Sequence, residues 1–449
     1  MNHSHQALTA RGLVARAPRL VALAALTLAA TAHAGYFQWD MVELPAHTGA
    51  TCGNGTPYRF FVNRTPFTTK TVVIFEGGGA CYDKNACLYK DGFLGAINPN
   101  GIPTDYMTRV VPSLPNEAGT TLGVFNSALL GYITPLASRV NTSRVQTQSW
   151  NIVYAPYCTG DVYTGNRVKL YPDPDGGTPL AYHHRGNLNT EAMARWLGAN
   201  MRRPQNLLVT GFSAGGAGAT ANYAYVREQM RPQRSALLAD SGPLFNVPRG
   251  ASPTAAPSAP LHATIREAWG LDGPNGLIAR MLARYPLAGG DADNLGSLNT
   301  AIARVFPQDR IGYTLTRSDA LFAAFAYDNF HPDIRAGSTI AERDARRLSR
   351  WRQEVDAWVA PMRGERNIGV YLPYRRDGVL KSHTTTMLTF DDTGIAEAGT
   401  RSVTDFIDNL IDGQGPVMRA EGAPSEPDSG WWNSLNRRLQ DSVFESLGL

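Results

Sequence analysis

A serine held between a strand-like run and a helical run constrains the fold of this chain more than any other feature. The apolar, β-rich run Asn206–Thr210 leads directly into Gly-Phe-Ser-Ala-Gly at 211–215, and the helical pattern Ala214–Met230 begins inside that turn. A serine on so sharp a turn needs small residues two positions before and after it, and the two glycines meet that need. The pattern is that of a nucleophile elbow, and it predicts Ser213 as a nucleophile at the carboxyl end of a strand.

Strand-like and helix-like stretches alternate along the chain, which is typical of a mainly parallel sheet covered by helices. The strand-like runs are Thr71–Phe75, Asn151–Ala155, Asn206–Thr210, Ser235–Ala239 and Gly369–Leu372. The helix-like runs are Thr190–Met201, Ala214–Met230, Thr339–Trp358, Ser402–Leu410 and Trp432–Leu447. We therefore expect the α/β class, with one catalytic domain over residues 35–449 and a loop and helical cap inserted around 248–300.

The first 34 residues have the features of an export signal. Arg11, Arg16 and Arg19 precede the apolar stretch 20–30, and Ala-His-Ala at 32–34 is the small-x-small pattern at which a signal peptidase cuts. The mature chain is then expected to be secreted or periplasmic. The apolar stretch is too short to span a bilayer, and no later stretch is longer, so no membrane span is expected.

The chain has four cysteines, which two disulfides could join in three ways. Cys81 and Cys87 flank a tight polar loop that suits a local bridge, and this leaves Cys52 to pair with Cys158. A metal site is the alternative, but no histidine lies at ligand spacing from either pair. The net charge of +4 is small and its charges are interspersed, which argues against nucleic acid as a partner.

A glycine-rich segment, Glu76-Gly77-Gly78-Gly79-Ala80-Cys81, follows the early strand-like run. Glycines there allow backbone N–H groups to approach a ligand closely, which is a common way to build an oxyanion hole. We expect Gly78, Gly79 and the Ala214 N–H to form that hole. The alternative is a tight turn held by the Cys81 bridge.

Four motifs in order along the chain carry a resemblance to a known family. They are Glu76–Cys81 with Cys87, Tyr157-Cys158-Thr159-Gly160-Asp161, Gly211–Gly216 and Ala239-Asp240-Ser241-Gly242. Together they resemble the pectin acetylesterases of plants and bacteria and the animal carboxylesterase Notum. The resemblance implies an α/β-hydrolase fold, a Ser-Asp-His triad, removal of acyl groups from hydroxyls, and the two cysteine pairs above.

The base and the acid of such a triad should follow the serine in the order acid, then histidine. His262 comes before any good acid and lies in the expected cap. His383 lies in a Ser-His segment after a strand-like run and resembles the family's catalytic histidine, with His331 as the rival. The segment containing Asp328 resembles the one that carries the family's aspartate, so Asp328 is the expected acid and Asp319 the second choice.

These residues predict a secreted serine carboxylesterase that needs neither metal nor organic cofactor. An O-acetyl ester on a polysaccharide is the first expectation for the substrate. Plant members of the family have a tryptophan where this chain has Ala80, so a longer acyl chain or a polyester is the alternative. A peptidase or amidase on the same fold and a non-enzymatic carbohydrate-binding relative are the rivals from other classes.

Overall fold

A computed structural model of the chain describes residues 36–90, 95–107, 134–139, 143, 145–286, 288–376 and 382–425. The expected export signal, 1–34, and the expected carboxyl-terminal helix, 432–447, lie outside the described residues. None of the described helices combines the length and the apolar character that crossing a bilayer requires.

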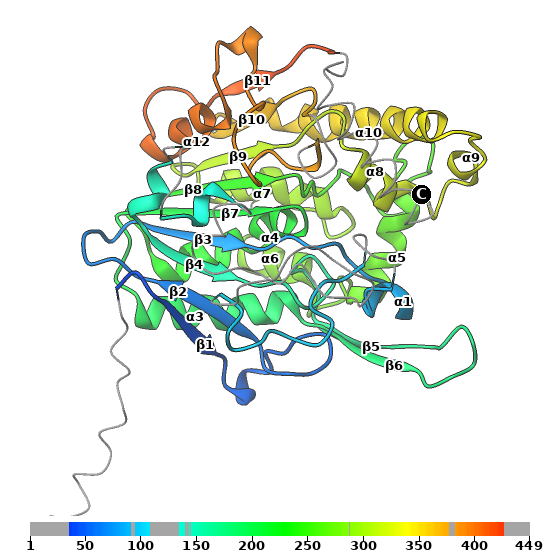
Figure 1. The fold of residues 1–449 in the computed structure, drawn as a ribbon, viewed down its shortest axis with the longest axis horizontal. Coiled ribbons are helices and arrows are strands. Elements are labelled where there is room, and N and C mark those ends of the chain that lie inside the picture. Colours follow the sequence, from blue (N-terminus) through cyan, green and yellow to red (C-terminus); the bar gives the residue numbers. More distant parts are fainter. Residues whose placement is uncertain are drawn as a thin grey trace, which may run out of the picture.

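A nine-stranded sheet runs through the described chain in the order β1-β2-β4-β3-β7-β8-β9-β10-β11 (Figure 1). β1 pairs with β2 and β2 with β4 in antiparallel fashion, and all later pairs are parallel. The bounds are β1 Trp39–Glu43, β2 Arg59–Asn63, β3 Thr71–Phe75, β4 Asn151–Ala155, β7 Asn206–Phe212, β8 Arg234–Asp240, β9 Arg310–Thr314, β10 Ile368–Leu372 and β11 Arg419–Glu421. A separate hairpin, β5 Arg167–Tyr171 with β6 Leu180–His184, projects from the body (Figure 1).

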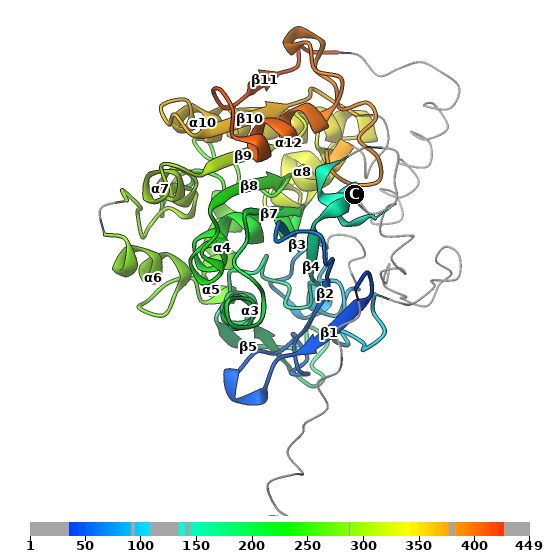
Figure 2. The ribbon, with the colours of Figure 1, turned by 90° about the vertical axis from the view of Figure 1, so that its left-hand side faces the viewer.

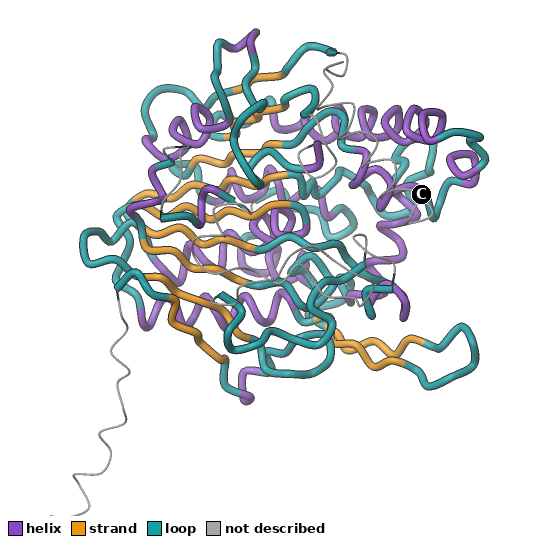
Figure 3. Tube along the Cα trace, viewed as in Figure 1, coloured by secondary structure: helices purple, strands orange, loops and turns teal. Residues whose placement is uncertain are grey.

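The central strands are almost entirely buried, because helices and loops cover both faces of the sheet. Every residue of β3, β4 and β10 is buried, which explains why these strands are continuous apolar runs without alternation. Figure 3 shows them as a continuous band bordered by helices. The expected α/β class with a mainly parallel sheet is confirmed.

The longer helices pack on the two faces of this sheet (Figure 2). Gly312 and Tyr313 are neighbours in β9, so they face opposite sides. Gly312 lies against Leu410 of α12, whereas Tyr313 packs on Trp358 of α10. The α-helices are α1 Lys84–Cys87, α3 Gly186–Asn200, α4 Ala214–Met230, α5 Ala259–Trp269, α6 Leu277–Arg284, α7 Leu298–Val305, α8 Ala320–Tyr327, α9 Pro332–Arg335, α10 Ile340–Met362 and α12 Val403–Asp412. Short 3-10 helices are η1 Ala46–Thr48, η3 Pro135–Ala137, η4 Gln146–Ser149, η5 Leu295–Ser297 and η6 Ala396–Ala398.

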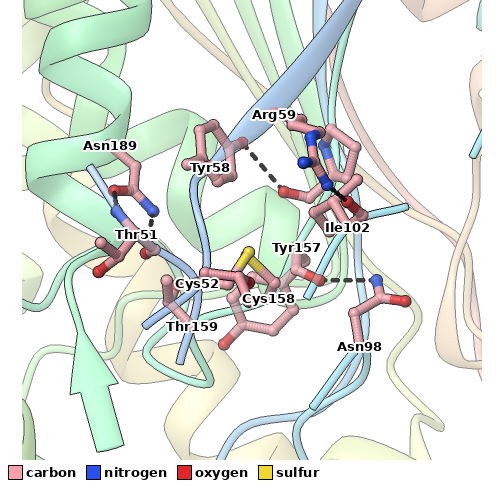
Figure 4. The surroundings of a disulfide bond; sticks show 12 residues. Thr51, Cys52, Tyr58, Arg59, Asn98, Ile102, Tyr157, Cys158, Thr159 and Asn189 are labelled. Atoms are coloured by element: carbon pink, nitrogen blue, oxygen red, sulfur yellow. Dashed lines mark hydrogen bonds between the residues drawn. A yellow bond between two sulfur atoms is a disulfide. The ribbon is translucent and has the colours of Figure 1, made fainter. Parts of the chain in front are cut away.

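Two disulfides, Cys52–Cys158 and Cys81–Cys87, join the cysteines in the expected pairs. The first ties the segment before β2 to the segment after β4 (Figure 4). Hydrogen bonds surround it: Asn98 Nδ2 donates to the Tyr157 carbonyl oxygen over 2.8 Å, and Tyr58 Oη donates to the Pro156 carbonyl oxygen over 3.0 Å. This bond and its surroundings fix the loops that follow the carboxyl end of β4.

Parallel pairing brings the ends of four strands to the same edge of the sheet. The register aligns Phe75 with Gly211, Phe212 with Asp240, and Asp240 with Thr314. In open α/β sheets, ligands bind outside the carboxyl ends of the strands. The segments that leave these ends carry the residues described next.

Candidate active site

Ser213 occupies the turn between β7 and α4 in a conformation that few residues adopt. Its φ is 56° and its ψ is −128°, a strained region that persists only where the surroundings enforce it. The Ser213 N–H donates to the Asp240 carbonyl oxygen over 2.8 Å. A Cβ at Gly211 would lie 2.2 Å from the Gly215 carbonyl oxygen, and one at Gly215 would lie 2.0 Å from that of Phe75. Only glycine fits at both positions, as the sequence predicts for a nucleophile elbow.

A chain of hydrogen bonds connects Ser213 with a histidine and a carboxylate. His383 Nε2 lies 2.8 Å from Ser213 Oγ, and His383 Nδ1 lies 2.7 Å from Asp319 Oδ2. Asp319 is also the N-cap of α8, because its Oδ1 accepts from the Phe322 N–H over 2.8 Å. Asp319 is fully buried and His383 is 6% exposed. One carboxylate oxygen thus starts a helix while the other orients the imidazole.

The structure corrects the expected partner of His383 from Asp328 to Asp319. Asp328 follows the other end of α8, about 13 Å along the helix from Asp319. Its carboxylate accepts from Arg347 of α10, with Nε 2.9 Å from Oδ1 and Nη2 2.5 Å from Oδ2. Both side chains are buried. Asp328 therefore makes a structural ion pair, and Asp319, the second choice from the sequence, takes the position beside the base.

Asp240, at the end of β8, holds the segment that carries His383. Its carboxylate accepts from the Thr385 N–H over 3.0 Å and from the Thr386 N–H over 2.7 Å. Arg376, which is also buried, donates to the Thr384 carbonyl oxygen over 2.7 Å. Since Asp240 also accepts from the Ser213 N–H through its own carbonyl oxygen, one residue positions both Ser213 and the segment that carries His383.

The pKa of His383 is raised above its ordinary value. Burial alone lowers the pKa, but the charge of Asp319, the hydrogen bond to it and the charge of Asp240 together outweigh burial. The imidazolium that forms when Ser213 loses its proton is therefore stabilised. This is the electrostatic arrangement that a general base needs.

The glycine-rich segment lies against the nucleophile. A Cβ at Gly77 would be 3.0 Å from Ser213 Cβ, and Gly78 and Gly79 have positive φ values of 140° and 57°. Ala214 is the first residue of α4, where backbone N–H groups have no partner within the helix and the helix dipole is positive. The three residues expected to bind an oxyanion thus border the turn that holds Ser213.

Glu76 directly precedes the glycines, and several hydrogen bonds hold its carboxylate in place. Its carboxylate accepts from the hydroxyls of Tyr106 and Tyr154, over 2.9 and 3.0 Å, and from the Tyr157 N–H over 2.9 Å. Burial raises the pKa of Glu76 to about 7, although these hydrogen bonds lower it. Its carboxylate is occupied by these donors, so Glu76 orders the loop.

A cavity of about 300 Å³ opens beside Ser213. This is about twice the 150 Å³ of a cavity that holds a benzene ring. Its walls are mostly apolar; they include Ile97, Val162, Phe212, Leu244, Phe245, Leu261, Ile265, Trp269, Leu295, Leu321, Phe322, Phe325, Met387 and Leu388. Helix α5, in the segment expected to form a cap, contributes Leu261, His262, Ile265 and Trp269 to this lining.

His331 and His184 have structural partners. His331 is the alternative candidate for the base, and its Nε2 lies 2.8 Å from the Pro257 carbonyl oxygen. His184 lies beside Cys81 and Cys87, and in the described part of the chain these three have atoms close enough to hold a metal ion. The two sulfurs are joined to each other, however, and metal ligation requires thiolates. His184 also has both ring nitrogens engaged, by Tyr171 and Thr159.

From the sequence, Asp240 is named only as part of a family motif, and Arg376 is not identified. A charged residue directly after the apolar run Ser235–Ala239 is a signal, since a buried carboxylate at a strand end needs partners. Arg376 has no such signal, because its three carbonyl acceptors come from a loop with no regular pattern.

Comparison with protein families gives a match to the pectinacetylesterase model over residues 134–256. The palmitoleoyl-protein carboxylesterase notum2 of Xenopus laevis is 26% identical over 42% of this chain and 33% of its own length. Human palmitoleoyl-protein carboxylesterase NOTUM is 24% identical over 42% of this chain and 32% of its own. The chain therefore spans about a third of the length of the curated relatives that it matches.

A solved structure of the Wnt deacylase Notum from Drosophila shares the fold. It aligns with a TM-score of 0.55 and 16% identity, over 87% of this chain and 98% of that chain. A second crystal form of the same protein gives a TM-score of 0.54. The structural match covers 87% of this chain, a larger share than the 42% covered by the sequence matches.

Proposed function

The chain is a relative of the pectinacetylesterase and Notum proteins, and from this relationship and the geometry around Ser213 we propose that it is a serine carboxylesterase. The observation that carries the proposal is the hydrogen-bonded series Asp319, His383 and Ser213, with spacings of 2.7 and 2.8 Å. A nucleophile and a base within hydrogen-bonding distance, with the base oriented by a third group, is the arrangement of covalent acyl transfer.

In the proposed reaction, Ser213 Oγ attacks the carbonyl carbon of an ester while His383 Nε2 takes the hydroxyl proton. Asp319 keeps the imidazole in the tautomer with its proton on Nδ1 and stabilises the imidazolium. The backbone N–H groups of Gly78, Gly79 and Ala214 bind the developing oxyanion, and each such donor is typically worth about 10²–10³ in kcat.

Collapse of the first tetrahedral intermediate breaks the bond to the alcohol, which leaves with the proton from His383. The acyl group remains on Ser213. A water molecule then attacks the acyl-enzyme, His383 takes its proton, and the carboxylic acid is released as Ser213 recovers its hydroxyl. No redox change takes place.

We infer that the acyl group is longer than acetyl. An acetyl group would leave most of a 300 Å³ apolar cavity unfilled, whereas an alkyl chain gains about 0.8 kcal/mol for each CH₂ that it buries. The names of the relatives, palmitoleoyl-protein carboxylesterases, also favour a longer acyl group. An O-acetyl ester on a polysaccharide is the second candidate, favoured by the pectinacetylesterase match.

We further propose that residues 35–449 form one catalytic domain, exported after removal of 1–34, with 248–300 as its cap. Both disulfides support an oxidising compartment, because such bonds persist mainly in exported proteins. The contribution of α5 to the cavity wall supports the cap.

Hydrolysis of p-nitrophenyl acetate, butyrate and octanoate by the parent and by Ser213→Ala tests the proposal. We expect the variant to lose at least about 10³-fold in rate, and the parent to favour octanoate in kcat/KM. A preference for acetate would instead favour an O-acetyl ester on a polysaccharide as the substrate. Equal rates in parent and variant would exclude the serine mechanism, and faster turnover of a matched anilide would favour the amidase.

A further inference from the structure

His262 is a polar group in a mostly apolar cavity wall. It lies in the first half of α5 and lines the cavity together with Leu261 and Ile265 of the same helix. The side chain is buried, with 7% of its surface exposed. The reaction described above uses His383 and leaves His262 without a role.

The ring nitrogens of His262 have no hydrogen-bond partner among the described residues. Nδ1 is enclosed and unpaired, and Nε2 makes no hydrogen bond. Other buried histidines in the described chain differ: His383 bonds through both nitrogens, and His331 through Nε2. A buried polar group without a hydrogen-bond partner is unfavourable, so we expect a bound ligand to supply that partner. Because Nδ1 is enclosed while His262 lines the cavity, we infer that Nε2 faces the open space.

Arg266 lies one helical turn further along α5 and affects the protonation of His262. Its guanidinium only donates hydrogen bonds, and its Nη1 is also enclosed without a partner. Burial and the charge of Arg266 lower the pKa of His262 to about 4, so the imidazole is neutral at ordinary pH. A neutral imidazole has one N–H and one lone pair, and the charge of a nearby guanidinium favours the lone pair on the ring nitrogen closer to it. We take the enclosed Nδ1 to carry the lone pair, which leaves the N–H on Nε2 as a donor toward the cavity.

We propose that His262 binds an oxygen atom carried on the acyl chain of the substrate. Its Nε2–H donates to a hydroxyl or to a second carbonyl placed along that chain, so the preferred substrates are esters of oxygenated acyl groups, including oligoesters. The inference rests on the proposed function and names the class of acyl group that the cavity takes.

The surroundings favour an uncharged oxygen acceptor. The neighbouring wall is apolar, and a plain alkyl chain would cover the Nε2–H without satisfying it. Sites built to hydrogen-bond a substrate group discriminate strongly against an analogue that lacks it. A free carboxylate on the acyl chain would lose its hydration in an apolar cavity and meet only a neutral imidazole, so its desolvation free energy would not be compensated.

The test compares p-nitrophenyl decanoate with hydroxy- and oxo-decanoates whose oxygen stands at successive carbons. For each ester, kcat/KM is divided by that of plain decanoate, in the parent, His262→Leu, His262→Gln and the control Ile265→Leu. We expect the parent to favour at least one oxygenated ester by about 10-fold or more. The ratio should fall close to one in His262→Leu, recover in part in His262→Gln, which keeps a donor, and persist in Ile265→Leu.

Ratios near one at every position in the parent, or ratios unchanged in His262→Leu, would overturn the inference. The hydroxy and oxo esters separate the two kinds of oxygen, and either preference supports it. If His262→Leu does not fold, the ratios of the parent and of His262→Gln still decide. Activity retained in Ser213→Ala would instead refute the proposed function, so the two failures are distinguishable.

Discussion

Replacing Asp319 and Asp328 with Asn, one at a time, should produce two opposite phenotypes. Asp319→Asn removes the charge that stabilises the imidazolium and allows His383 to adopt the wrong tautomer. We expect a loss of about 10⁴ in kcat, as for the corresponding change in other Ser-His-Asp enzymes. The fold should persist, because an Asn side-chain oxygen can still cap α8 through the Phe322 N–H.

Asp328→Asn should leave kcat nearly unchanged in the folded protein and lower its stability. Arg347 is fully buried and Asp328 is 3% exposed, and breaking such a pair costs about 3–5 kcal/mol. Because Arg347 keeps a second partner in Asp344, we take the lower value, about 3 kcal/mol. With an unfolding entropy of about 2.1 cal/mol/K per residue over roughly 400 residues, Tm should fall by about 4 °C.

Single-turnover hydrolysis of p-nitrophenyl octanoate and thermal unfolding of the same preparations measure both effects. Asp344→Asn is the matched control, because it removes the more exposed partner of Arg347 and should change Tm less. The assignment of Asp319 would be wrong if Asp328→Asn lost the larger share of kcat while its Tm stayed at the parental value.

Three further results are expected. The value of kcat/KM should fall as the pH drops through the raised pKa of His383, because a protonated imidazole cannot take the serine proton. The midpoint of this fall should lie above the ordinary histidine pKa of about 6.5, and a pH–rate profile measures the midpoint. Glu76 has a folded-state pKa of about 7, above the pKa of a glutamate in the unfolded chain. Between these two pKa values Glu76 keeps its proton in the folded state and has lost it in the unfolded state. The free energy of unfolding therefore falls as the pH rises through this window. Relative to Glu76→Gln, denaturant unfolding should show the parent losing about 2–3 kcal/mol between about pH 5 and 8; a constant difference would contradict the assignment. Replacing Cys52 and Cys158 with Ala should cost about 5 kcal/mol and replacing Cys81 and Cys87 about 2 kcal/mol, since the bonds close loops with sequence separations of 106 and 6; the reverse order in urea midpoints would contradict the loop-entropy reasoning.

The sequence is most informative where one local rule determines the structure. The runs Thr71–Phe75 and Asn151–Ala155 are buried on both faces, so their apolar continuity predicts β3 and β4 with their observed bounds. The elbow is equally local, because steric limits at two glycines and the strand-to-helix order define it. The edge strand β1 has no such continuity, since several of its residues are partly exposed, and it was not expected.

The triad acid could not be chosen by local rules. Asp319 and Asp328 lie at the two ends of one short helix, and only the direction of that helix decides which of them meets His383. Family resemblance favoured Asp328. A structural signal favoured Asp319: it follows the end of β9 by five residues, at the edge of the sheet where Ser213 lies. The buried Arg347 that pairs with Asp328 comes from a helix whose docking no local pattern reveals.

Because Ser213, Asp319 and His383 follow different strands, the recovery of esterase activity should indicate when those strands have assembled. Ser213 leaves β7, whereas Asp319 and His383 follow β9 and β10, and these strands join the sheet only through β8. Parallel pairing over such separations closes long loops and is slow. A chain that has paired β3, β7 and β8 already has its nucleophile turn but still lacks a base. The return of esterase activity during refolding should therefore coincide with the docking of β9 and β10, later than the signals of the central strands.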